Sequence, residues 1–184
     1  MTAGDQTATG GGEPSLLPLV IGIGNRFRRD DGVAGAVLDA LAAPAGTPGA
    51  SRTDVEVAEL DGEPTRVVDA WAQRQLVVVV DALADPTRRP GDVVTMRAED
   101  ATTVAGWVAP LSGHSAGLAE AMRLGEVLDR MPAQLVVVGV FGADFAEGPG
   151  LSDAVAGAVE DAAAAVREVL AGQPAGSGSP GVPG

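Results

Sequence analysis

The sequence predicts an α/β fold, a three-layer open, mostly parallel twisted sheet of about five strands with helices on both faces. Short apolar runs alternate along the chain with segments in which apolar residues recur at helical spacing. Two of these runs, residues 76–80 and 135–140, are almost entirely apolar and rich in Val, which is typical of parallel strands covered on both faces. With 184 residues, of which 46% are hydrophobic, the chain can form a sizeable core.

The first half of the chain repeats a strand–helix order. Leu19–Ile23 is a short apolar run that predicts a strand. The apolar residues of the helix after it are Val33, Ala34, Val37, Leu38 and Leu41. Residues 55–60 alternate between apolar and polar side chains, as in a less buried strand. One face of the following helix, which has proline in its first turn, carries Pro64, Val67, Val68 and Trp71.

The second half begins with residues 76–80, which we expect to form the central strand. The connection after them contains Asp85-Pro86 and Pro90-Gly91 and is too short for a helix, so residues 93–96 should return antiparallel or run along an edge. The next helix has a stripe formed by Leu118, Met122, Gly125 and Leu128. Residues 135–140 form another buried strand. The last helix packs through Val155, Val159, Ala162, Val166 and Val169.

Composition at the two ends predicts one α/β domain at residues 16–171 between disordered tails at 1–15 and 172–184. Both tails are rich in small residues and proline and show no periodicity. The N-terminal segment has neither a basic nor an apolar region, so we do not expect a signal peptide. No apolar run approaches the ~20 residues of a membrane helix. We therefore expect a cytoplasmic protein.

Charge and missing residue types exclude several classes of function. The net charge of −13 opposes binding to nucleic acid or to an anionic membrane. The chain has no Cys and no Lys, since all 12 basic residues are Arg, and His114 is its only histidine. Thiolate metal sites, Schiff-base chemistry and Ser-Lys dyads are therefore excluded. Any chemistry must come from carboxylates, hydroxyls, Arg, main-chain groups and one imidazole.

Polar residues are expected at the edge of the sheet where the parallel strands end, because ligands bind there in such folds. Asp30 and Asp31 follow the first strand, Asp81 directly follows a run of valines, and His114 precedes a helix that starts at the same edge. Each has an ordinary structural interpretation. The adjacent aspartates could cap a helix, Asp81 could accept hydrogen bonds from loop amides, and His114 could cap or pack.

Taken together, Asp31, Asp81 and His114 form a nitrogen and oxygen ligand set with coordination positions left over. We expect neither aspartate to be deeply packed, because an unpaired buried carboxylate is costly.

Two motifs of other enzyme classes occur in the sequence but lack features that their function requires. Gly22-Ile23-Gly24 begins like a dinucleotide fingerprint, but the third glycine is replaced by Phe27. Residues 113–117 match the G-x-S-x-G nucleophile elbow, yet the only histidine lies next to Ser115 and no strand directly precedes the motif. We therefore expect that Ser115 is not a nucleophile.

Several short motifs follow one another along nearly the whole predicted domain. They are G-I-G-N and D-D-G within residues 22–32, Asp61-Gly62, V-V-D-A at 79–82, a histidine opening the next helix, V-V-G-V at 137–140, and Gly150-Leu151-Ser152. In this order they resemble the endopeptidases that mature the large subunit of nickel-iron hydrogenases by removing its C-terminal extension. The sequence departs from that family at Glu63-Pro64, where a second glycine is common.

The resemblance implies that Asp31, Asp81 and His114 are the catalytic and metal-contacting residues, with Asp61 in a supporting position. It also implies that the metal is nickel already inserted in the substrate, the hydrogenase large-subunit precursor, rather than a permanent cofactor. Such a metal could polarise the scissile carbonyl or lower the pKa of water while a carboxylate acts as general base. Hydrolysis by carboxylates alone, with the metal serving only for recognition, stays open.

Alternatives remain at this point. The chain could be a non-catalytic checkpoint protein that binds the precursor's metal, or a nucleotide-binding α/β domain. Arg26, Arg28 and Arg29 make the first loop basic, as a solvated loop or as a contact with an acidic substrate surface.

Overall fold

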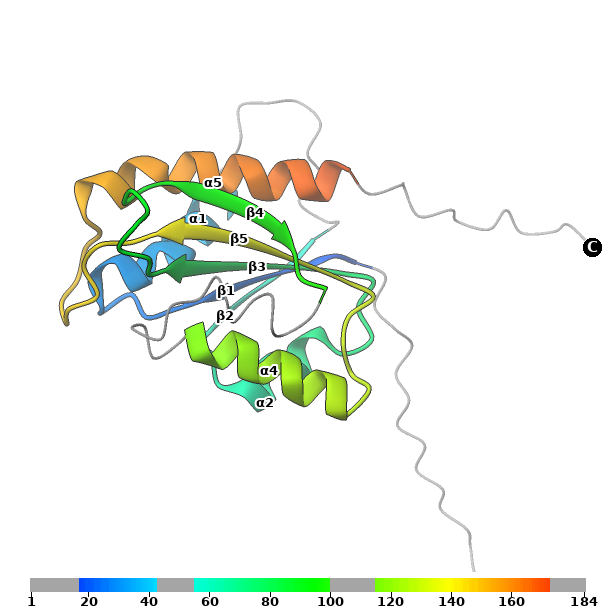
Figure 1. The fold of residues 1–184 in the computed structure, drawn as a ribbon. Coiled ribbons are helices and arrows are strands. Elements are labelled where there is room, and N and C mark those ends of the chain that lie inside the picture. Colours follow the sequence, from blue (N-terminus) through cyan, green and yellow to red (C-terminus); the bar gives the residue numbers. More distant parts are fainter. Residues whose placement is uncertain (1–16, 43–54, 100–114, 173–184) are drawn as a thin grey trace, which may run out of the picture.

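The computed structural model describes residues 17–42, 55–99 and 115–172 (Figure 1). In chain order its elements are β1 (Leu19–Ile23), the 3-10 helix η1 (Arg29–Gly32), α1 (Val33–Ala42), β2 (Glu56–Leu60), α2 (Pro64–Trp71), β3 (Leu76–Leu83), β4 (Val93–Arg97), α4 (Ser115–Val127), β5 (Gln134–Phe141) and α5 (Asp153–Ala171). The predicted tails lie outside the described residues except for Gly172, so the predicted domain limits stay predictions.

The strands form one open sheet in the order β2-β1-β3-β5-β4. β1 pairs in parallel with β2 and β3, and β3 pairs in parallel with β5. β4 is antiparallel to β5 and forms one edge, as the short connection after β3 predicted. The predicted fold class is therefore confirmed.

Strand β3 is longer than the sequence suggested. We expected the strand to end at Asp81, but it continues to Leu83 and all its residues are buried. The cause is its neighbour β5, which pairs with β3 residue by residue up to the pair of Leu83 with Phe141. Asp81 therefore lies within the sheet, opposite Gly139, and not in the loop that follows.

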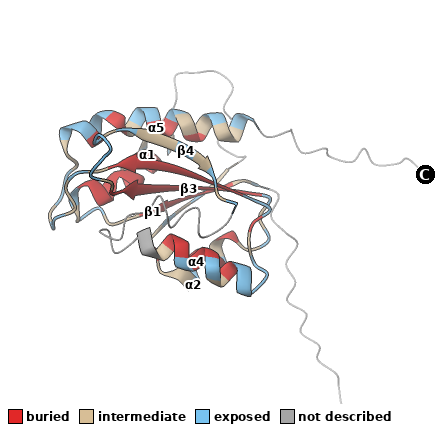
Figure 2. Ribbon diagram, in the orientation of Figure 1, coloured by how far each residue is buried: buried red, intermediate tan, exposed pale blue. Residues whose placement is uncertain are grey.

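Helices cover both faces of the sheet (Figure 1). Alternate residues of each central strand point to opposite faces. Val78 and Val80 pack in a cluster with α1 and α5, whereas Val77 and Val79 pack in a second cluster with α2 and α4. The central strands β1, β3 and β5 are buried, the edge strands β2 and β4 are partly buried, and the outer helix surfaces are exposed (Figure 2). One predicted stripe residue is wrong: α4 ends at Val127, so Leu128 lies beyond the helix and is 49% exposed.

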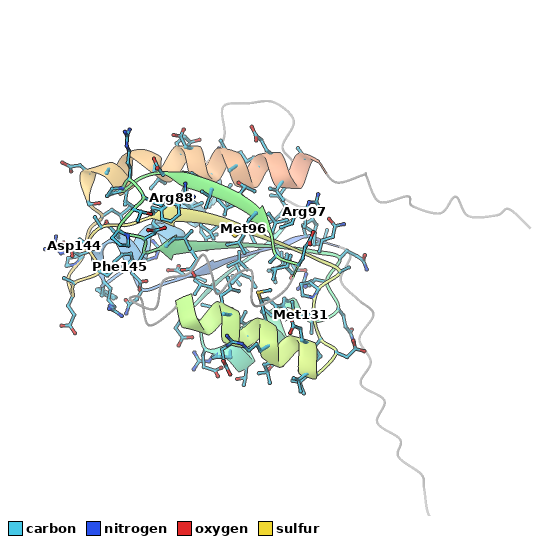
Figure 3. All side chains as sticks on the ribbon, viewed as in Figure 1. Arg88, Met96, Arg97, Met131, Asp144 and Phe145 are labelled. Carbon is cyan, nitrogen blue, oxygen red and sulfur yellow. The ribbon has the colours of Figure 1, made fainter. Side chains whose placement is uncertain are left out.

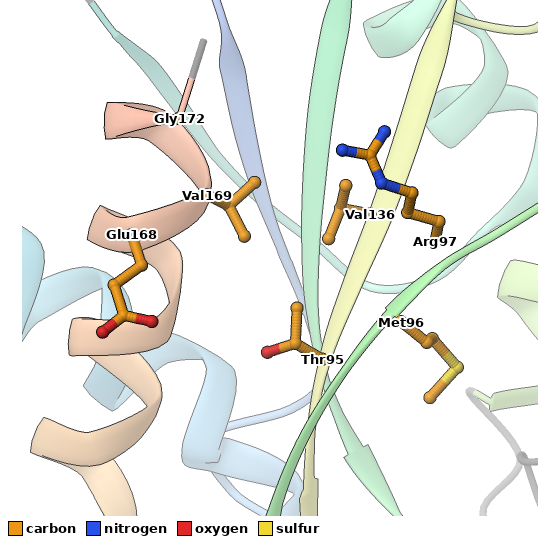
Figure 4. Close-up of a pocket in the computed structure, with 7 residues that line it drawn as sticks. All are labelled: Thr95, Met96, Arg97, Val136, Glu168, Val169 and Gly172. Carbon is orange, nitrogen blue, oxygen red and sulfur yellow. The ribbon is translucent and has the colours of Figure 1, made fainter.

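A shallow hollow of about 350 Å³ lies between the C-terminal end of α5 and strands β4 and β5 (Figure 4). It is lined by Thr95, Met96, Arg97, Val136, Glu168, Val169 and Gly172. These residues lie toward the end of the sheet where the parallel strands begin, away from the predicted site. Among the described residues, no helix has both the length and the apolarity needed to cross a bilayer.

Candidate active site

The carboxyl edge of the sheet, where the parallel strands end, holds both predicted aspartates. Asp31 lies in η1, shortly after the end of β1, and Asp81 lies near the end of β3. Asp31 is 1% exposed and Asp81 is 0% exposed. The expectation that neither would be deeply packed is therefore wrong.

The loop after β1 folds back onto Asp31. Gly24 has φ +152°, and a Cβ atom there would lie 2.1 Å from the carbonyl oxygen of Asp31, so only glycine fits. The next residue, Asn25, donates its backbone N–H to Asp31 Oδ2 at 3.0 Å. The G-N part of the first motif thus serves the close approach of this loop to the Asp31 carboxylate.

Three backbone amides of this loop are already used within the chain. Gly24 N–H donates to the carbonyl of Leu60, Asn25 N–H donates to Asp31, and Phe27 N–H donates to Asn25 Oδ1. A phosphate group would need such amides to be free. The loop is therefore built around a carboxylate of its own and does not favour the nucleotide-binding alternative.

Asp81 is a fully buried carboxyl group. Asp81 is two residues from both Val79 and Leu83, so its side chain lies on the same face of the sheet as theirs, the face covered by α2 and α4. Within the part of the chain that the structure describes, neither of its oxygens has a hydrogen-bond partner. The predicted bonds to loop amides are therefore not found there.

Burial, followed by the negative charge of Asp31, raises the pKa of Asp81 well above its ordinary value, and the adjacent Ala82 N–H offsets only part of this rise. The two carboxyl groups are thus close enough for the charge on one to oppose ionisation of the other. A divalent cation between them would remove that repulsion.

Asp30 has a different role from its neighbour Asp31. Its Oδ2 accepts hydrogen bonds from Ala143 N–H, Asp144 N–H and the Ser152 hydroxyl, and its Oδ1 accepts one from Ser152 N–H, at 2.7–3.0 Å. Burial by itself would raise the pKa of Asp30, but these donors outweigh it and the pKa is lowered. Asp30 is therefore a structural link from η1 to the β5–α5 connection, and the predicted helix-capping role is not observed.

Further bonds join the same two segments. Arg29 pairs with Asp144 at 3.3 Å, Arg28 donates to the carbonyl oxygen of Phe145, and Arg29 N–H donates to the carbonyl of Gly148 at 2.9 Å. Asp144 and Phe145 lie at the end of the molecule toward which the arrowheads of β3 and β5 point (Figure 3). The loop that carries the aspartates is thus held in place by the β5–α5 connection.

Arg26 is also bonded within the chain. Its guanidinium group forms ion pairs with Glu59 and Asp39 and donates to the carbonyl of Gly35. Hydrogen bonds to Glu59 and then to Asp39 raise the pKa of Arg26. Together with the contacts of Arg28 and Arg29, this shows that the three arginines of the first loop form hydrogen bonds and ion pairs within the chain.

The Asp61-Gly62 loop after β2 is held by α2. Asp61 accepts hydrogen bonds from the Arg66 guanidinium at 3.0 Å and from Glu63 N–H at 3.3 Å. Glu63 in turn caps α2 by accepting from the backbone N–H groups of Thr65 and Arg66. The departure from the family pattern at Glu63-Pro64 is therefore a helix start, with Glu63 as N-cap and proline in the first turn.

Helix α4 begins against this loop. A Cβ atom at Gly117 would lie only 2.2 Å from the carbonyl oxygen of Gly62, so the first turn of α4 and the Gly62 backbone are in direct contact. His114, which immediately precedes α4, lies outside the described residues, as does the Ser115 side chain. In the described ranges no three His, Cys, Asp or Glu side chains gather as a metal site.

Comparison with known proteins gives the family. Residues 45–169 match the model of the hydrogenase maturation protease family, HycI. This chain belongs to that family. The resemblance found in the sequence is confirmed, and the protein is a peptidase, a hydrolase of peptide bonds. Comparison with curated protein sequences gave no match.

Several solved structures share the fold. The hydrogenase maturating endopeptidase HybD from E. coli is 25% identical with a TM-score of 0.70, and the match covers 85% of this chain and 93% of that one. An endopeptidase from Escherichia coli is 24% identical with a TM-score of 0.73 and coverages of 84% and 92%. The [NiFe] hydrogenase maturation protease HybD from Thermococcus kodakarensis is 22% identical, with a TM-score of 0.65 and coverages of 84% and 99%.

Proposed function

We propose that this protease removes the C-terminal extension of a nickel-loaded hydrogenase large-subunit precursor, and that Asp31, Asp81 and His114 contact the nickel of that substrate. The observation that carries the proposal is the buried pair of carboxyl groups, in which Asp81 has no hydrogen-bond partner among the described residues and a raised pKa. Such a group is costly in the free protein and is stabilised when a cation arrives.

The charge of the pair supports recognition of a metal-loaded substrate. Carboxylate oxygens and a neutral imidazole suit a divalent borderline metal such as nickel, and they leave coordination positions for the substrate's own ligands, for water or for the scissile carbonyl. A precursor without metal brings no positive charge to the two carboxyl groups, so their mutual repulsion persists. The protease would thus act only after nickel insertion.

The position of α4 supports His114 as the third residue. Asp81 lies on the sheet face that α4 covers, and α4 starts at Ser115, directly after His114 in the sequence. The contact of Gly117 with Gly62 brings the start of α4 to the carboxyl edge. An imidazole is the usual nitrogen ligand at such a position.

The arrangement can hydrolyse a peptide bond. The substrate's nickel would polarise the scissile carbonyl or lower the pKa of a bound water molecule. A carboxylate of the pair accepts the proton of the attacking water and returns it to the leaving amine, which becomes the new N-terminus of the released extension.

Incubation of the purified protein with nickel-loaded and nickel-free precursor, followed by mass measurement of the precursor, tests this proposal. We expect loss of the extension only from the nickel-loaded form, and no loss with Asp81→Asn. Equal cleavage of both forms would refute nickel recognition. Binding of the loaded precursor without cleavage would favour the checkpoint alternative, in which the protein reports on the metal and does not cut.

A further inference from the structure

We propose that Phe27 is the apolar anchor that binds the polypeptide of the substrate beside the carboxylate site. This inference rests on the proposed function, because it takes the precursor protein as the partner. It concerns the contact made by the substrate's chain and not the contact made by its metal.

Phe27 differs from the other described aromatic residues by its exposure. Its relative exposure is 74%, whereas Trp71 and Phe141 are buried at 0% and 2% and Phe145 packs against the core. Burying most of a phenylalanine side chain in an interface is favourable, and aromatic residues are enriched at the centres of interfaces. An exposed ring at the edge of an active site therefore indicates a contact surface.

The backbone of Phe27 is fixed although its side chain is exposed. Its N–H donates to Asn25 Oδ1 at 2.9 Å, and its carbonyl accepts from Gly148 N–H at 2.8 Å. The next residue, Arg28, donates its N–H to the carbonyl of Asn25 at 3.0 Å. Because these hydrogen bonds already fix the backbone of the loop, little further backbone entropy is lost when a partner covers the Phe27 ring.

Phe27 belongs to the short loop that holds Asp31. Asn25, whose side chain bonds the Phe27 amide, donates its own N–H to the Asp31 carboxylate. Because Asp31 and Asp81 are 1% and 0% exposed, these carboxyl groups present almost no surface to a large protein. Most of the affinity for the substrate's polypeptide must therefore come from the residues around the site.

The neighbours of Phe27 favour an apolar partner. The guanidinium groups of Arg26, Arg28 and Arg29 are engaged with Asp39 and Glu59, with the Phe145 carbonyl, and with Asp144 respectively. At 74% exposure, Phe27 is the exposed apolar residue among these charged side chains, which are bonded within the chain. We infer that it covers an apolar side chain of the hydrogenase precursor close to the scissile bond.

Steady-state cleavage of the nickel-loaded precursor by Phe27→Ala and Phe27→Leu tests the inference, with the precursor's binding to each variant measured in parallel by calorimetry. Leu128→Ala is the matched control, because Leu128 is also an exposed apolar residue, at 49%, but follows the C-terminal end of the 13-residue helix α4, whose first turn contacts Gly62. Melting temperatures show that each variant is folded.

For Phe27→Ala we expect KM and Kd to rise about tenfold, which corresponds to about 1.4 kcal/mol, with kcat within about twofold of wild type. Phe27→Leu should recover most of the loss and Leu128→Ala should change neither constant. Unchanged KM and Kd in a folded Phe27→Ala protein would overturn the inference.

Two further outcomes are informative. Loss of self-association in Phe27→Ala, seen by ultracentrifugation, with precursor binding intact, would show that a second copy of this chain covers the ring and would also overturn the inference. If the wild-type protein fails to cleave the loaded precursor, the proposed function is refuted. The calorimetric comparison then decides the role of Phe27 by itself, since weaker binding supports it and unchanged binding refutes it.

Discussion

Replacement of Asp30 by Asn tests whether this carboxylate is a structural link. The side chain keeps its shape but has one oxygen in place of two. The favourable orientation places the amide oxygen at Oδ2, where it keeps the three donors Ala143 N–H, Asp144 N–H and Ser152 Oγ–H. The amide nitrogen then takes the place of Oδ1 and faces the Ser152 N–H. In the wild-type protein this N–H donates to Asp30 Oδ1 at 2.7 Å. That buried donor loses its acceptor, and the other three bonds lose the negative charge.

The cost follows from these bonds. An unsatisfied buried donor costs about 1–3 kcal/mol, and weakening of the charge-assisted bonds adds to it, so we expect Asp30→Asn to lose about 2–4 kcal/mol of unfolding free energy. For a chain of 184 residues this lowers Tm by roughly 4–16 °C. Denaturant unfolding at pH 7 and thermal melts measure both quantities.

A neighbouring aspartate provides the control for this experiment. Asp144→Asn removes the charge of a side chain that is 44% exposed and pairs with Arg29 on the surface, so it should cost less than about 1 kcal/mol. If Asp30→Asn is as stable as Asp144→Asn, the hydrogen bonds of Asp30 do not hold the β5–α5 connection against η1, and the reasoning is refuted.

Other substitutions at the site have distinct expected outcomes. Asp81→Asn should leave the unfolding free energy unchanged or raise it by about 1–3 kcal/mol, because it removes a buried charge, while cleavage of the loaded precursor is lost; a destabilised variant that still cleaves would show that Asp81 is structural. The pKa of Asp81 is raised in the folded state, so the stability that its protonation contributes is present below the ordinary pKa of 3.8 and is lost as pH rises through the folded-state pKa. The stability advantage of Asp81→Asn should therefore disappear in unfolding curves recorded toward pH 4. Asp30 has a lowered pKa, so its stabilisation is present above 3.8 and is lost as pH falls through the folded value; Asp30→Asn and wild type should converge at the acid end of a pH series. Gly24→Ala places a Cβ atom 2.1 Å from the Asp31 carbonyl and should abolish cleavage and lower Tm, a result that a wild-type melt and rate would contradict. Ser115→Ala should cleave the precursor within a few-fold of wild type, since the sequence offers no independent base for this serine; complete loss in a folded variant would make Ser115 a nucleophile.

The sequence by itself determined the fold class and the family. The apolar runs and helical stripes are local patterns with periods of two and 3.6 residues, and the core of a parallel sheet follows from them. The order of G-N, D-D-G and V-D-A also places Asp31 just after one strand and Asp81 near the end of another. These features can be predicted from the sequence because each depends on residues close together in the chain.

Tertiary structure decided the roles of the individual carboxylates. Asp30 and Asp31 are adjacent in the sequence, yet Asp30 bonds residues 113 to 122 positions away while Asp31 faces Asn25 and Asp81. The burial of Asp81 follows from the pairing of β3 with β5 up to Leu83, which an apolar run that stops at Val80 does not reveal. The desolvation, repulsion and hydrogen bonds that distinguish these aspartates come from groups distant in the chain, so local sequence patterns carry no record of them.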